Sequence, residues 1–409
     1  MKLNQIITSL LENDLYKWSM GQVIFHQFSD YTTTWVFKCR NKNVFFTPEM
    51  VEEIKEQIKA YCELRYTEDE LDYLRNIKWI KGSYVDFLRL WHPRYEDFTI
   101  TTDDECGLAI ETNGSWLNTS VYETPVLAIV NEVYFRMKYN YNELIESFKQ
   151  RLEEKVQKLE KGQLYIANFS EFGFRRRLSR EAEEYAVKRL ATAKYCSSTF
   201  VGTSNVYLAK KFGVKPVGTM AHEFCMIVGQ SNPKHNVAYS NHYMLSSWVK
   251  EYGVMNGIAL TDTITTDCFL LDFDDVFCKI FDGVRHDSSD PILWGEKMIA
   301  HYEKMGVDAK TKTLLFSDSL DFKEADRIFR HFSGRARCAF GIGTFLSNDV
   351  ADLKTGEKIP ALNIVMKPIM ANLTPIAKLS DCDGKNMCRD QEYIDYLKRC
   401  IDWRMEHEN

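Results

Sequence analysis

The sequence predicts an α/β protein, with an irregular β/α barrel-like domain and an α+β N-terminal domain that the C-terminal segment completes. Short apolar strands alternate with helices from residue 164 to residue 344, which is typical of a parallel sheet. The preceding residues instead mix helices with antiparallel strands, and a late apolar strand, Asn363–Met370, is expected to return to this first layer. We therefore assign residues 1–140, with about 355–409, to the N-terminal domain and 141–354 to the barrel-like domain.

The composition predicts a folded chain with a large core. Of the 409 residues 45% are hydrophobic, and 25 Phe, 21 Tyr and 8 Trp exclude a disordered chain. The 52 basic and 58 acidic residues give a net charge of -6, which argues against a general nucleic-acid or membrane-surface binder. Any phosphate site must therefore be built locally.

The N-terminal residues do not follow the pattern of a signal peptide, because residues 1–5 lead directly into a helical pattern. No run of about 18 apolar residues is present to span a bilayer. We expect a soluble, cytoplasmic protein.

The 11 cysteines are scattered and form no C-x-x-C pair. We expect free thiols in a reducing compartment, acting as small core residues and not as metal ligands. They are Cys39, Cys62, Cys106, Cys196, Cys225, Cys268, Cys278, Cys338, Cys382, Cys388 and Cys400.

Capping and turn signals define the first layer. Thr47-Pro48 is expected to open a helix, and Thr67 with Glu70 forms a capping box. Asn113-Gly114 predicts a hairpin turn. Its expected strands are Leu108–Thr112 and Trp116–Thr119.

Two helices are expected before and within the region of alternating strands and helices. A long amphipathic helix is expected from Asn142, with an apolar face that ends before Gly162. A second helix is expected at Asn205–Lys211, capped by Gly213 and followed by a strand at Val214–Val217. The apolar face of the first helix consists of Leu144, Phe148, Leu152, Val156 and Leu159.

Polar or glycine-rich clusters follow seven expected strands. In parallel sheets the carboxyl ends of the strands share one edge, where ligands bind. The strands and the clusters after them are Leu164–Ala167 with Glu171 to Arg177, Phe200–Val201 with Gly202 to Asn205, Val214–Val217 with Gly218 to Glu223, Ile258–Leu260 with Thr261 to Thr263, Val284 with Arg285 to Asp290, Leu314–Phe316 with Ser317 to Ser319, and Ala339–Phe340 with Gly341 to Thr344. The number of units suggests a closed, irregular barrel.

His222 lies in the third of these clusters and is a candidate catalytic residue. A hydrogen-bonded structural histidine is the alternative. Asp262, at another strand end, is a candidate carboxylate that orients the His222 imidazole and raises its basicity. Arg285 and Asp287 alternate along one strand end, so His286 is expected on the opposite face. A surface salt bridge is the alternative for this pair.

Two clusters are candidate anion sites. The backbone N–H groups of Gly341 and Gly343, with the Thr344 hydroxyl, can cradle a phosphate, although a turn glycine is the alternative. Phe172 precedes three consecutive arginines, Arg175 to Arg177, and an aromatic plate beside guanidinium groups suits a flat anion or a sugar phosphate. A solvated helix entry is the alternative for the arginines.

In this order, the clusters closely resemble those of the nicotinate phosphoribosyltransferases, which are type II phosphoribosyltransferases. The resemblance covers nearly the whole chain. It rests on Asn13 to Met20, Glu171 to Arg176, Gly202 to Asn205, Gly218 to Glu223, Leu260 to Thr263, Val284 to Pro291, Phe340 to Thr344 and Lys378 to Asp381.

The resemblance implies a reaction of nicotinate with phosphoribosyl pyrophosphate that yields nicotinate mononucleotide and pyrophosphate in NAD salvage. It implies ATP as co-substrate, with His222 as the autophosphorylated residue, and Mg²⁺ bound by substrate phosphates and not by a dedicated protein motif. Asp262 and Asp287 are the other expected catalytic residues. A homodimer is implied, in which Tyr16 reaches a neighbouring subunit's site.

The resemblance also assigns ligand contacts. Nicotinate contacts are expected from Tyr16, Phe172, Thr203, Thr219 and Arg285. Phosphoribosyl pyrophosphate contacts are expected from Arg175, Ser317, Asp318, Gly341, Gly343 and Thr344.

Two serines stand where relatives usually carry glycine: Ser288, after the aspartate, and Ser319. If Ser288 needs a positive φ, serine costs on the order of 1 kcal/mol there.

Two other functions remain open from the sequence. An enzyme of the same fold that takes nicotinamide needs an acceptor for the amide N–H, whereas Gly202 to Asn205 supply a neutral loop and Arg285 favours an anion. A non-catalytic phosphate-binding sensor is the alternative from a different class.

Overall fold

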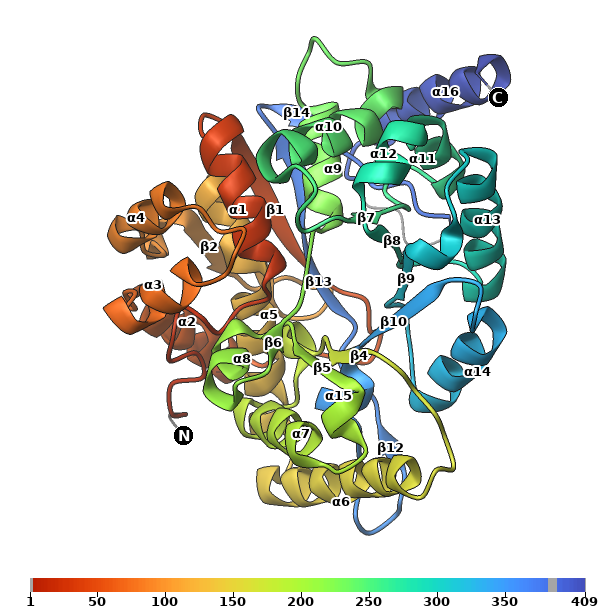
Figure 1. Cartoon of the computed structure of the whole chain (residues 1–409). Helices are drawn as coiled ribbons and strands as arrows, with labels where there is room; N and C mark the ends of the chain where they lie inside the picture. The colour runs from red at the N-terminus through yellow and green to blue at the C-terminus, as the bar shows by residue number, and fades with distance from the viewer. Residues whose placement is uncertain (1–2, 382–387, 409) are drawn as a thin grey trace.

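The computed structural model describes residues 3–381 and 388–408, and its strands form two main sheets (Figure 1). The first is a five-stranded antiparallel sheet in the order β14-β13-β1-β3-β2. Strand β13 pairs with β1 from Cys39↔Ile364 to Thr33↔Ala371, which confirms the predicted return of the late strand to the first layer. The domain boundaries themselves stay a prediction. The strands are β1 (Thr32–Cys39), β2 (Phe98–Thr101), β3 (Ala109–Ser115), β13 (Ile364–Ala371) and β14 (Thr374–Pro375).

The helices of the first layer begin where the capping signals predict. Thr47 caps α2 by accepting from the Met50 amide, and Thr67 and Glu70 form the predicted capping box of α3. Thus local sequence signals determine both starts. The helices are α1 (Tyr16–Gln27), α2 (Pro48–Cys62), α3 (Glu68–Arg75), α4 (Gly82–Leu90), α5 (Trp116–Lys138) and the 3-10 turn η1 (Tyr95–Asp97).

The predicted hairpin at Asn113-Gly114 is wrong. Both residues lie inside β3, opposite Thr34 and Thr33 of β1, and the chain then enters α5 at Trp116. Trp116 is fully buried, so the apolar segment after the glycine packs as a helix and not as a second strand. Cross-strand pairing and burial override the turn signal here.

The second sheet has seven parallel strands in the order β6-β5-β4-β10-β9-β8-β7. The two edge strands, β6 and β7, pair with one neighbour each among the described strands, so the curled sheet is an open, barrel-like layer and not a closed barrel. The strands are β4 (Phe169–Glu171), β5 (Phe200–Thr203), β6 (Lys215–Pro216), β7 (Ile258–Leu260), β8 (Gly283–His286), β9 (Thr313–Phe316) and β10 (Arg337–Ile342).

Helices cover the outer side of the curled sheet in Figure 1, and α6 runs along its lower end. A separate pair of short strands, β11 (Val350–Ala351) and β12 (Lys358–Ile359), lies near α6. The helices are α6 (Tyr141–Glu160), α7 (Arg180–Thr192), α8 (Val206–Phe212), α9 (His222–Gln230), α10 (Ser240–Tyr252), α11 (Thr266–Asp272), α12 (Asp275–Ile280), α13 (Pro291–Lys304), α14 (Phe322–Phe332) and α15 (Thr344–Ser347); the 3-10 turns are η2 (Phe174–Arg176), η3 (Cys196–Ser198), η4 (Val237–Tyr239) and η5 (Ala309–Thr311).

Most expected strands of this region form, but the first is displaced. Residues 164–167 precede β4, and Asn168 has a left-handed φ of 52° just before the strand begins at Phe169. The strand therefore contains Glu171, which the pattern had placed after it. The predicted helix boundaries at Gly162 and Gly213 are confirmed by their left-handed φ values of 68° and 64°.

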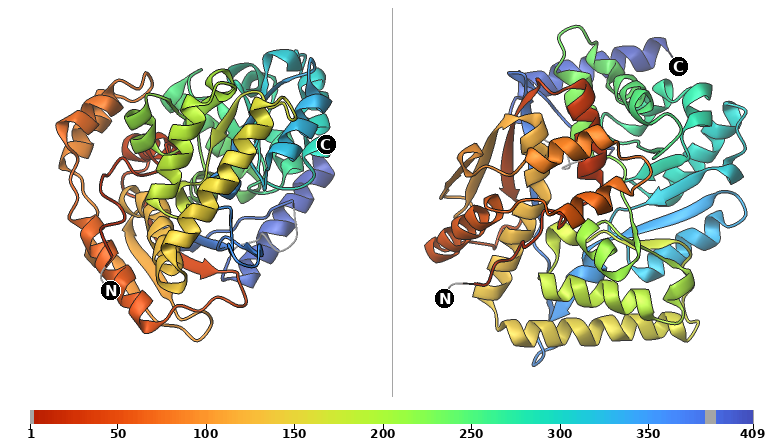
Figure 2. Two further views of the ribbon diagram at one scale, coloured as in Figure 1. Left: turned by 90° about the horizontal axis from the view of Figure 1, so that it is seen from below. Right: turned by 60° about the vertical axis from the view of Figure 1, so that its left-hand side comes forward.

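The C-terminal segment crosses from the first sheet to the edge of the second. After β14, Leu379 forms a parallel bridge with Ile264, and its amide donates to the Thr263 carbonyl at 2.8 Å. The segment ends in α16 (Gln391–His407), where Arg404 donates to Asp272 at 2.7 Å. The two views of Figure 2 show α16 at the periphery, close to the helices that follow β6 and β7.

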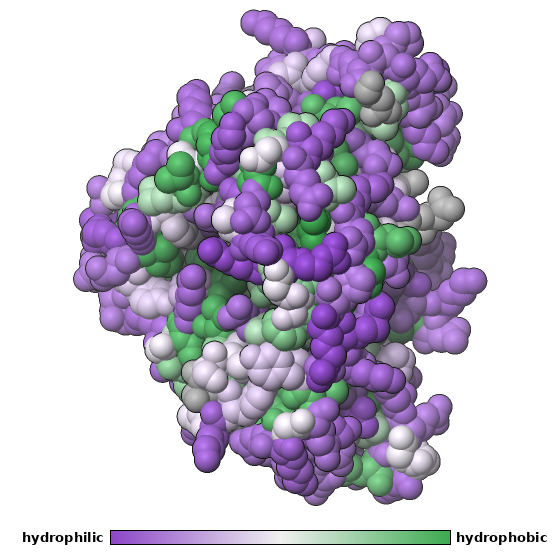
Figure 3. Space-filling model, turned by 45° about the vertical axis from the view of Figure 1, so that its right-hand side comes forward, coloured by the Kyte–Doolittle hydropathy of each residue, from purple (hydrophilic) through white to green (hydrophobic). Residues whose placement is uncertain are grey.

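Ten cysteines fall in the described residues, and all are free thiols, as predicted; Cys382 lies outside those residues. No helix within residues 3–381 and 388–408 is long and apolar enough to cross a bilayer. The face in Figure 3 is mostly hydrophilic, with small hydrophobic groups between the charged side chains.

Candidate active site

His222 is the first residue of α9 and lies beside two carboxylates from neighbouring strand ends. Its Nε2 atom is 2.9 Å from Asp262 Oδ1 and 3.6 Å from Asp287 Oδ2. Only 8% of the side chain is exposed, and Nδ1 makes no hydrogen bond to any residue that the structure describes. The structure thus brings together the three predicted catalytic residues.

Asp262 is held by donors from three separate parts of the chain. Besides the His222 contact, its Oδ2 accepts from Ser288 Oγ at 2.6 Å and from Lys378 Nζ at 3.0 Å. The carboxylate is 1% exposed, so these donors replace the water that it loses on folding. Asp262 is therefore fixed as an anion.

Charge and burial keep the His222 ring neutral. Burial and the Lys378 ammonium lower the pKa of His222 to about 4, although Asp262 and Asp287 act to raise it. Burial opposes ionisation of Asp262, but His222, Lys378 and Ser288 outweigh it and hold the pKa of that carboxyl well below its usual range. At pH 7 the ring therefore donates Nε2–H to Asp262 and presents the lone pair of Nδ1. Asp262 contacts the ring nitrogen and acts to raise the pKa of His222, but burial and Lys378 make the net effect a decrease.

Arg285 joins β8 to the loops after β6 and β9. It donates to Asp287 Oδ1 at 3.1 Å, to Ser317 Oγ at 3.0 Å and to the carbonyl of Met220 at 3.0 Å. The Arg285 side chain is 14% exposed, and that of Asp287 is 23% exposed. The pair is a partly buried part of the site and not a surface salt bridge.

His286 lies on the opposite face of β8, as the alternation predicts. Its ring packs against Trp294 and Phe316, with centroid distances of 5.2 and 5.9 Å. His286 is 2% exposed and has a structural place behind the site.

Ligand atoms of His222, Asp262 and Asp287 lie within 4.8 Å of one another, which is the spacing of a metal cluster. Each carboxylate already contacts a protein cation, Lys378 on Asp262 and Arg285 on Asp287. A metal ion bound to these carboxylates would have to compete with the ammonium and guanidinium groups for their oxygens. The expectation that magnesium is held by substrate phosphates, and not by a dedicated protein motif, stays a prediction.

Phe172 follows β4 and lies over β10. A side chain at Gly341 would collide with the Phe172 ring, so the glycine allows the aromatic plate to approach the strand. Gly341 lies within β10, whereas Gly343 and Thr344 follow it, at the start of α15. The predicted phosphate contacts of these three residues stay a prediction.

The loop after β5 is fixed by a buried carboxyl group. Thr203 Oγ1 donates to Glu171 at 2.6 Å and accepts from the Asn205 amide at 3.1 Å. Burial and nearby Glu183 raise the pKa of Glu171 well above its usual range. Thr219, in the loop before α9, is half-buried. The predicted nicotinate contacts of Thr203 and Thr219 stay predictions.

The three consecutive arginines have different roles. Arg177 is fully buried and pairs with Glu12 at 3.1 Å and Glu183 at 2.9 Å, so it is structural. Arg175 is 34% exposed and lies 3.9 Å from Glu123. Burial and the adjacent Arg175 lower the pKa of Arg176 to about 10. Arg175 and Arg176 are the half-buried members of the triplet, and the predicted phosphoribosyl pyrophosphate contact of Arg175 stays a prediction.

Tyr16 begins α1, and its amide nitrogen lies close to Gly218, before His222. Its hydroxyl is buried and has no hydrogen-bond partner among the described residues. Burial and the nearby Glu123 raise the pKa of this hydroxyl well above its ordinary value. The structure describes one chain, so contact with a neighbouring subunit's site stays a prediction.

Ser289, and not Ser288, has the positive φ that the sequence raised for this loop. Ser289 has a φ of 75°, and Ser319 has a φ of 52° beside the half-buried Asp318. The Ser288 hydroxyl instead donates a hydrogen bond to Asp262. Glycine would suit the backbone at Ser289 and Ser319, and serine at Ser288 supplies a hydrogen bond.

Sequence reasoning missed Lys378 and Ser288 as site residues. Lys378 lies in one of the short segments that carry the family resemblance, but it follows no strand of the parallel sheet. Its place beside Asp262 depends on the C-terminal crossing. The signal for Ser288 was its position directly after Asp287.

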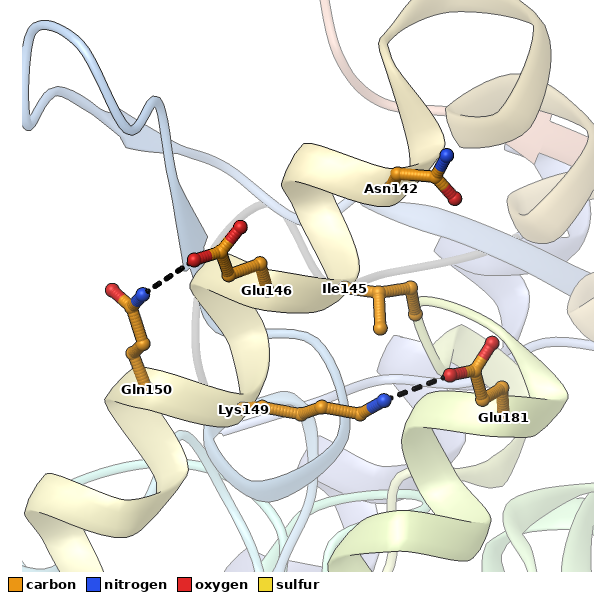
Figure 4. A pocket seen from close by; sticks show the side chains of 6 residues that line it. All are labelled: Asn142, Ile145, Glu146, Lys149, Gln150 and Glu181. Atoms are coloured by element: carbon orange, nitrogen blue, oxygen red, sulfur yellow. Dashed lines mark hydrogen bonds and ion pairs between the residues drawn. The ribbon is translucent and has the colours of Figure 1, made fainter.

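A shallow surface hollow of about 390 Å³ lies elsewhere, between α6 and the start of α7. Figure 4 shows Lys149 of α6 pointing toward Glu181 of α7, with their charged atoms 2.9 Å apart. None of the predicted site residues lines this hollow; Lys149 and Glu181 pair with each other, and Glu146 accepts from the Gln150 amide at 3.1 Å. Its lining consists of Asn142, Ile145, Glu146, Lys149, Gln150 and Glu181.

Comparisons with known proteins agree over nearly the whole chain. Residues 167–403 match the nicotinate phosphoribosyltransferase (NAPRTase) family, and residues 11–131 match the NAPRTase N-terminal domain. The nicotinate phosphoribosyltransferase of Cupriavidus necator is 44% identical over 396 residues, covering 96% of this chain and 98% of that protein. That of Ralstonia pickettii is 43% identical with the same coverage.

Solved structures give the same result for the fold. The crystal structure of nicotinate phosphoribosyltransferase from Vibrio cholerae superposes with a TM-score of 0.90 at 34% identity, covering 98% of this chain and 95% of that one. The structure from Porphyromonas gingivalis superposes with a TM-score of 0.89 at 34% identity, covering 97% and 100%.

Proposed function

Because the chain belongs to the nicotinate phosphoribosyltransferase family, we propose that it converts nicotinate and phosphoribosyl pyrophosphate to nicotinate mononucleotide and pyrophosphate, coupled to ATP hydrolysis through phosphorylation of His222. The observation that carries the coupling is the His222–Asp262 contact of 2.9 Å in a buried site. We place the reaction in NAD salvage in the cytoplasm, as expected from the sequence.

In the phosphorylation step, the lone pair of His222 Nδ1 attacks the γ-phosphorus of ATP. The new N–P bond forms as the P–O bond to ADP breaks, and ADP leaves with the electron pair. The ring keeps its Nε2 proton and gains positive charge, which Asp262 stabilises through their hydrogen bond. Hydrolysis of this phosphohistidine later returns inorganic phosphate and the neutral ring.

In the transfer step, the pyridine nitrogen of nicotinate forms a bond to ribose C1 while the bond from C1 to pyrophosphate breaks. The ribose carries positive charge as pyrophosphate leaves, and we expect the Asp287 carboxylate to stabilise it. Arg285 suits the nicotinate carboxylate. The proposed phosphate and pyrophosphate contacts come from Arg175, Ser317, Asp318, Gly341, Gly343 and Thr344.

We propose that Mg²⁺ enters with the phosphate groups of the substrates, because protein cations already pair with Asp262 and Asp287. Bound to those phosphates, the ion would supply positive charge that offsets the negative charge of the departing pyrophosphate.

Nicotinamide is the alternative substrate, and one observation bears on it. Ser204 donates to the carboxyl of Asp14 at 2.5 Å, so an acceptor lies behind the loop that was expected to be neutral. Burial raises the pKa of Asp14, which favours its protonated form. Arg285 still favours the nicotinate anion. A competition assay with equal concentrations decides: faster consumption of nicotinamide would reject the substrate assignment.

Labelled ATP tests the coupling directly. We expect acid-labile phosphate on the wild-type protein and none on His222→Ala, and we expect this variant to lose the ATP-dependent rate more than the ATP-independent transfer. Equal labelling of both proteins would reject His222 as acceptor. Absence of transfer with all substrates present would instead favour the sensor function.

We also propose a homodimer in which Tyr16 completes a neighbouring subunit's site beside Phe172. A dilute monomer with full activity would reject this arrangement.

A further inference from the structure

We propose that Lys378 is a positioning residue of the phosphoryl-accepting site: its ammonium group balances the charge of Asp262, so that the carboxylate orients the His222 ring without drawing a second proton onto it. This inference rests on the proposed function, in which His222 accepts a phosphoryl group. It adds a residue from the C-terminal segment to a site otherwise built by the strand ends of the parallel sheet.

The two oxygens of Asp262 contact different side chains. Oδ1 faces His222 Nε2 at 2.9 Å, and Oδ2 faces Lys378 Nζ at 3.0 Å. The Lys378 side chain is 11% exposed and that of Asp262 is 1% exposed, so water screens this pair weakly. Lys378 therefore acts on His222 through the carboxylate that both of them contact.

Hydrogen bonds on both sides hold Lys378 in place. The preceding residue, Ala377, exchanges two hydrogen bonds of 2.8 Å with the Gln230 side chain at the end of α9. The following residue, Leu379, pairs with the backbone around Ile264, and Asp381 accepts from the Thr266 amide at 2.8 Å. The segment is thus tied to the helix that His222 begins and to the loop that carries Asp262.

The charges that face His222 come from three elements and balance. The loop after β7 supplies Asp262, the end of β8 supplies Asp287, and the C-terminal segment supplies Lys378. Asp287 is itself paired with Arg285 at 3.1 Å. Two carboxylates therefore face two cations around a buried imidazole. Without Lys378, Asp262 would have an unbalanced charge beside the ring and would favour the imidazolium form.

The protonation state decides whether the ring can react. An imidazolium has no free lone pair, whereas a neutral ring with its proton on Nε2 presents Nδ1 to a phosphoryl group. Burial is the main cause of the lowered pKa of His222, about 4, and the Lys378 ammonium lowers it further. Lys378 thereby allows the His222 ring to stay neutral and nucleophilic although Asp262 and Asp287 lie beside it.

Titration of the His222 ring tests the proposal without any activity measurement. Imidazole ¹⁵N shifts of labelled protein report charge and tautomer, and His222→Gln identifies the signal. We expect a neutral ring protonated on Nε2 between pH 5 and 9 in the wild type. We expect Lys378→Met to move the titration midpoint upward by at least about one pH unit, and Lys378→Arg to leave it near the wild-type value. An unchanged midpoint in Lys378→Met would overturn the proposal.

The pH profile of phosphohistidine formation gives the second test. We expect labelling of Lys378→Met to fall on the acid side. At pH values below both midpoints, the loss should be about tenfold for every pH unit by which the titration midpoint of His222 rises. A uniform loss at every pH would indicate a merely structural role and reject the proposal. Lys312→Met is the matched control, because Lys312 is a buried lysine that bonds the Phe281 carbonyl at 2.7 Å, away from the site.

Two safeguards keep the outcomes distinct. Lys378→Gln, which keeps a donor toward Asp262 but removes the charge, replaces Lys378→Met if that variant does not fold, and the same rise of the titration midpoint is expected. If ATP does not label even the wild type, the proposed coupling fails, while the ring titration still decides the role of Lys378.

Discussion

Ser288 donates a hydrogen bond of 2.6 Å to Asp262 Oδ2, the oxygen that also faces Lys378. The contact links the strand end that carries Arg285 and Asp287 to the carboxylate that orients His222. A residue noted from the sequence as a departure from glycine thus has a chemical role.

Ser288→Ala should weaken both folding and phosphorylation, because it removes a donor from a buried carboxylate. Hydrogen bonds to charged groups contribute about 1.5–3 kcal/mol, so we expect a loss of that order in the free energy of unfolding by urea. Labelling by ATP should fall as well. The control is Ser198→Ala, whose exposed hydroxyl donates to the Tyr195 carbonyl at 3.3 Å. Equal stability of the two variants would contradict the role of Ser288.

Ser289→Gly should stabilise the protein. Its φ of 75° is a left-handed conformation that costs a non-glycine residue on the order of 1 kcal/mol. We expect a higher Tm for Ser289→Gly and a lower one for Ser288→Gly, which gains no backbone relief and loses the bond to Asp262. The reverse order would show that the strained position is Ser288.

Gly341→Ala should impair the aromatic plate, because the added methyl group collides with the Phe172 ring. Aromatic contacts contribute about 0.5–1.5 kcal/mol, so we expect roughly a two- to twelvefold rise in KM for nicotinate. Labelling by ATP should change less. Gly82→Ala is the control, since nothing lies within 4 Å of its added methyl group. An unchanged KM would separate Phe172 from substrate binding.

Stability should decrease as the pH falls from about 6.5 to about 4. His222 has its pKa lowered to about 4 in the folded protein, so the unfolded chain binds a proton in this window that the folded protein does not. The difference corresponds to roughly 3 kcal/mol, present above pH 6.5 and lost below pH 4. The free energy of unfolding, measured by urea at several pH values, should change less steeply with pH in His222→Gln than in the wild type. Identical slopes would contradict a buried neutral ring.

Lys17→Met should strongly destabilise the protein. Lys17 Nζ bridges Glu123 at 2.7 Å and Glu223 at 2.6 Å, and all three side chains are 1% exposed. Removing the cation leaves two buried carboxylates with less compensation for their charges, at a cost of about 3–5 kcal/mol. Lys297→Met, which breaks the exposed 2.6 Å pair with Asp267, should cost under about 1 kcal/mol. Comparable losses in Tm for Lys17→Met and Lys297→Met would contradict the expected difference between the buried and the exposed ion pair.

Helix caps and glycine stops could be predicted from the sequence because each depends on only a few neighbouring residues. The caps at Thr47 and Thr67 and the glycine stops at Gly162 and Gly213 form as expected, since each depends on backbone geometry within one turn. The turn signal at Asn113-Gly114 failed because pairing with β1 and burial of Trp116 outweigh a local preference.

The sequence by itself determined the alternating fold and the meeting of His222, Asp262, Arg285 and Asp287. These residues lie at or just after the carboxyl ends of parallel strands, and the geometry of such a sheet places those ends on one edge. Only the tertiary structure decided the protonation of His222. That property depends on burial and on Lys378, which reaches Asp262 through a C-terminal crossing 116 residues further along the chain. Charge balance acts through space, and no local pattern encodes which distant cation will share a carboxylate.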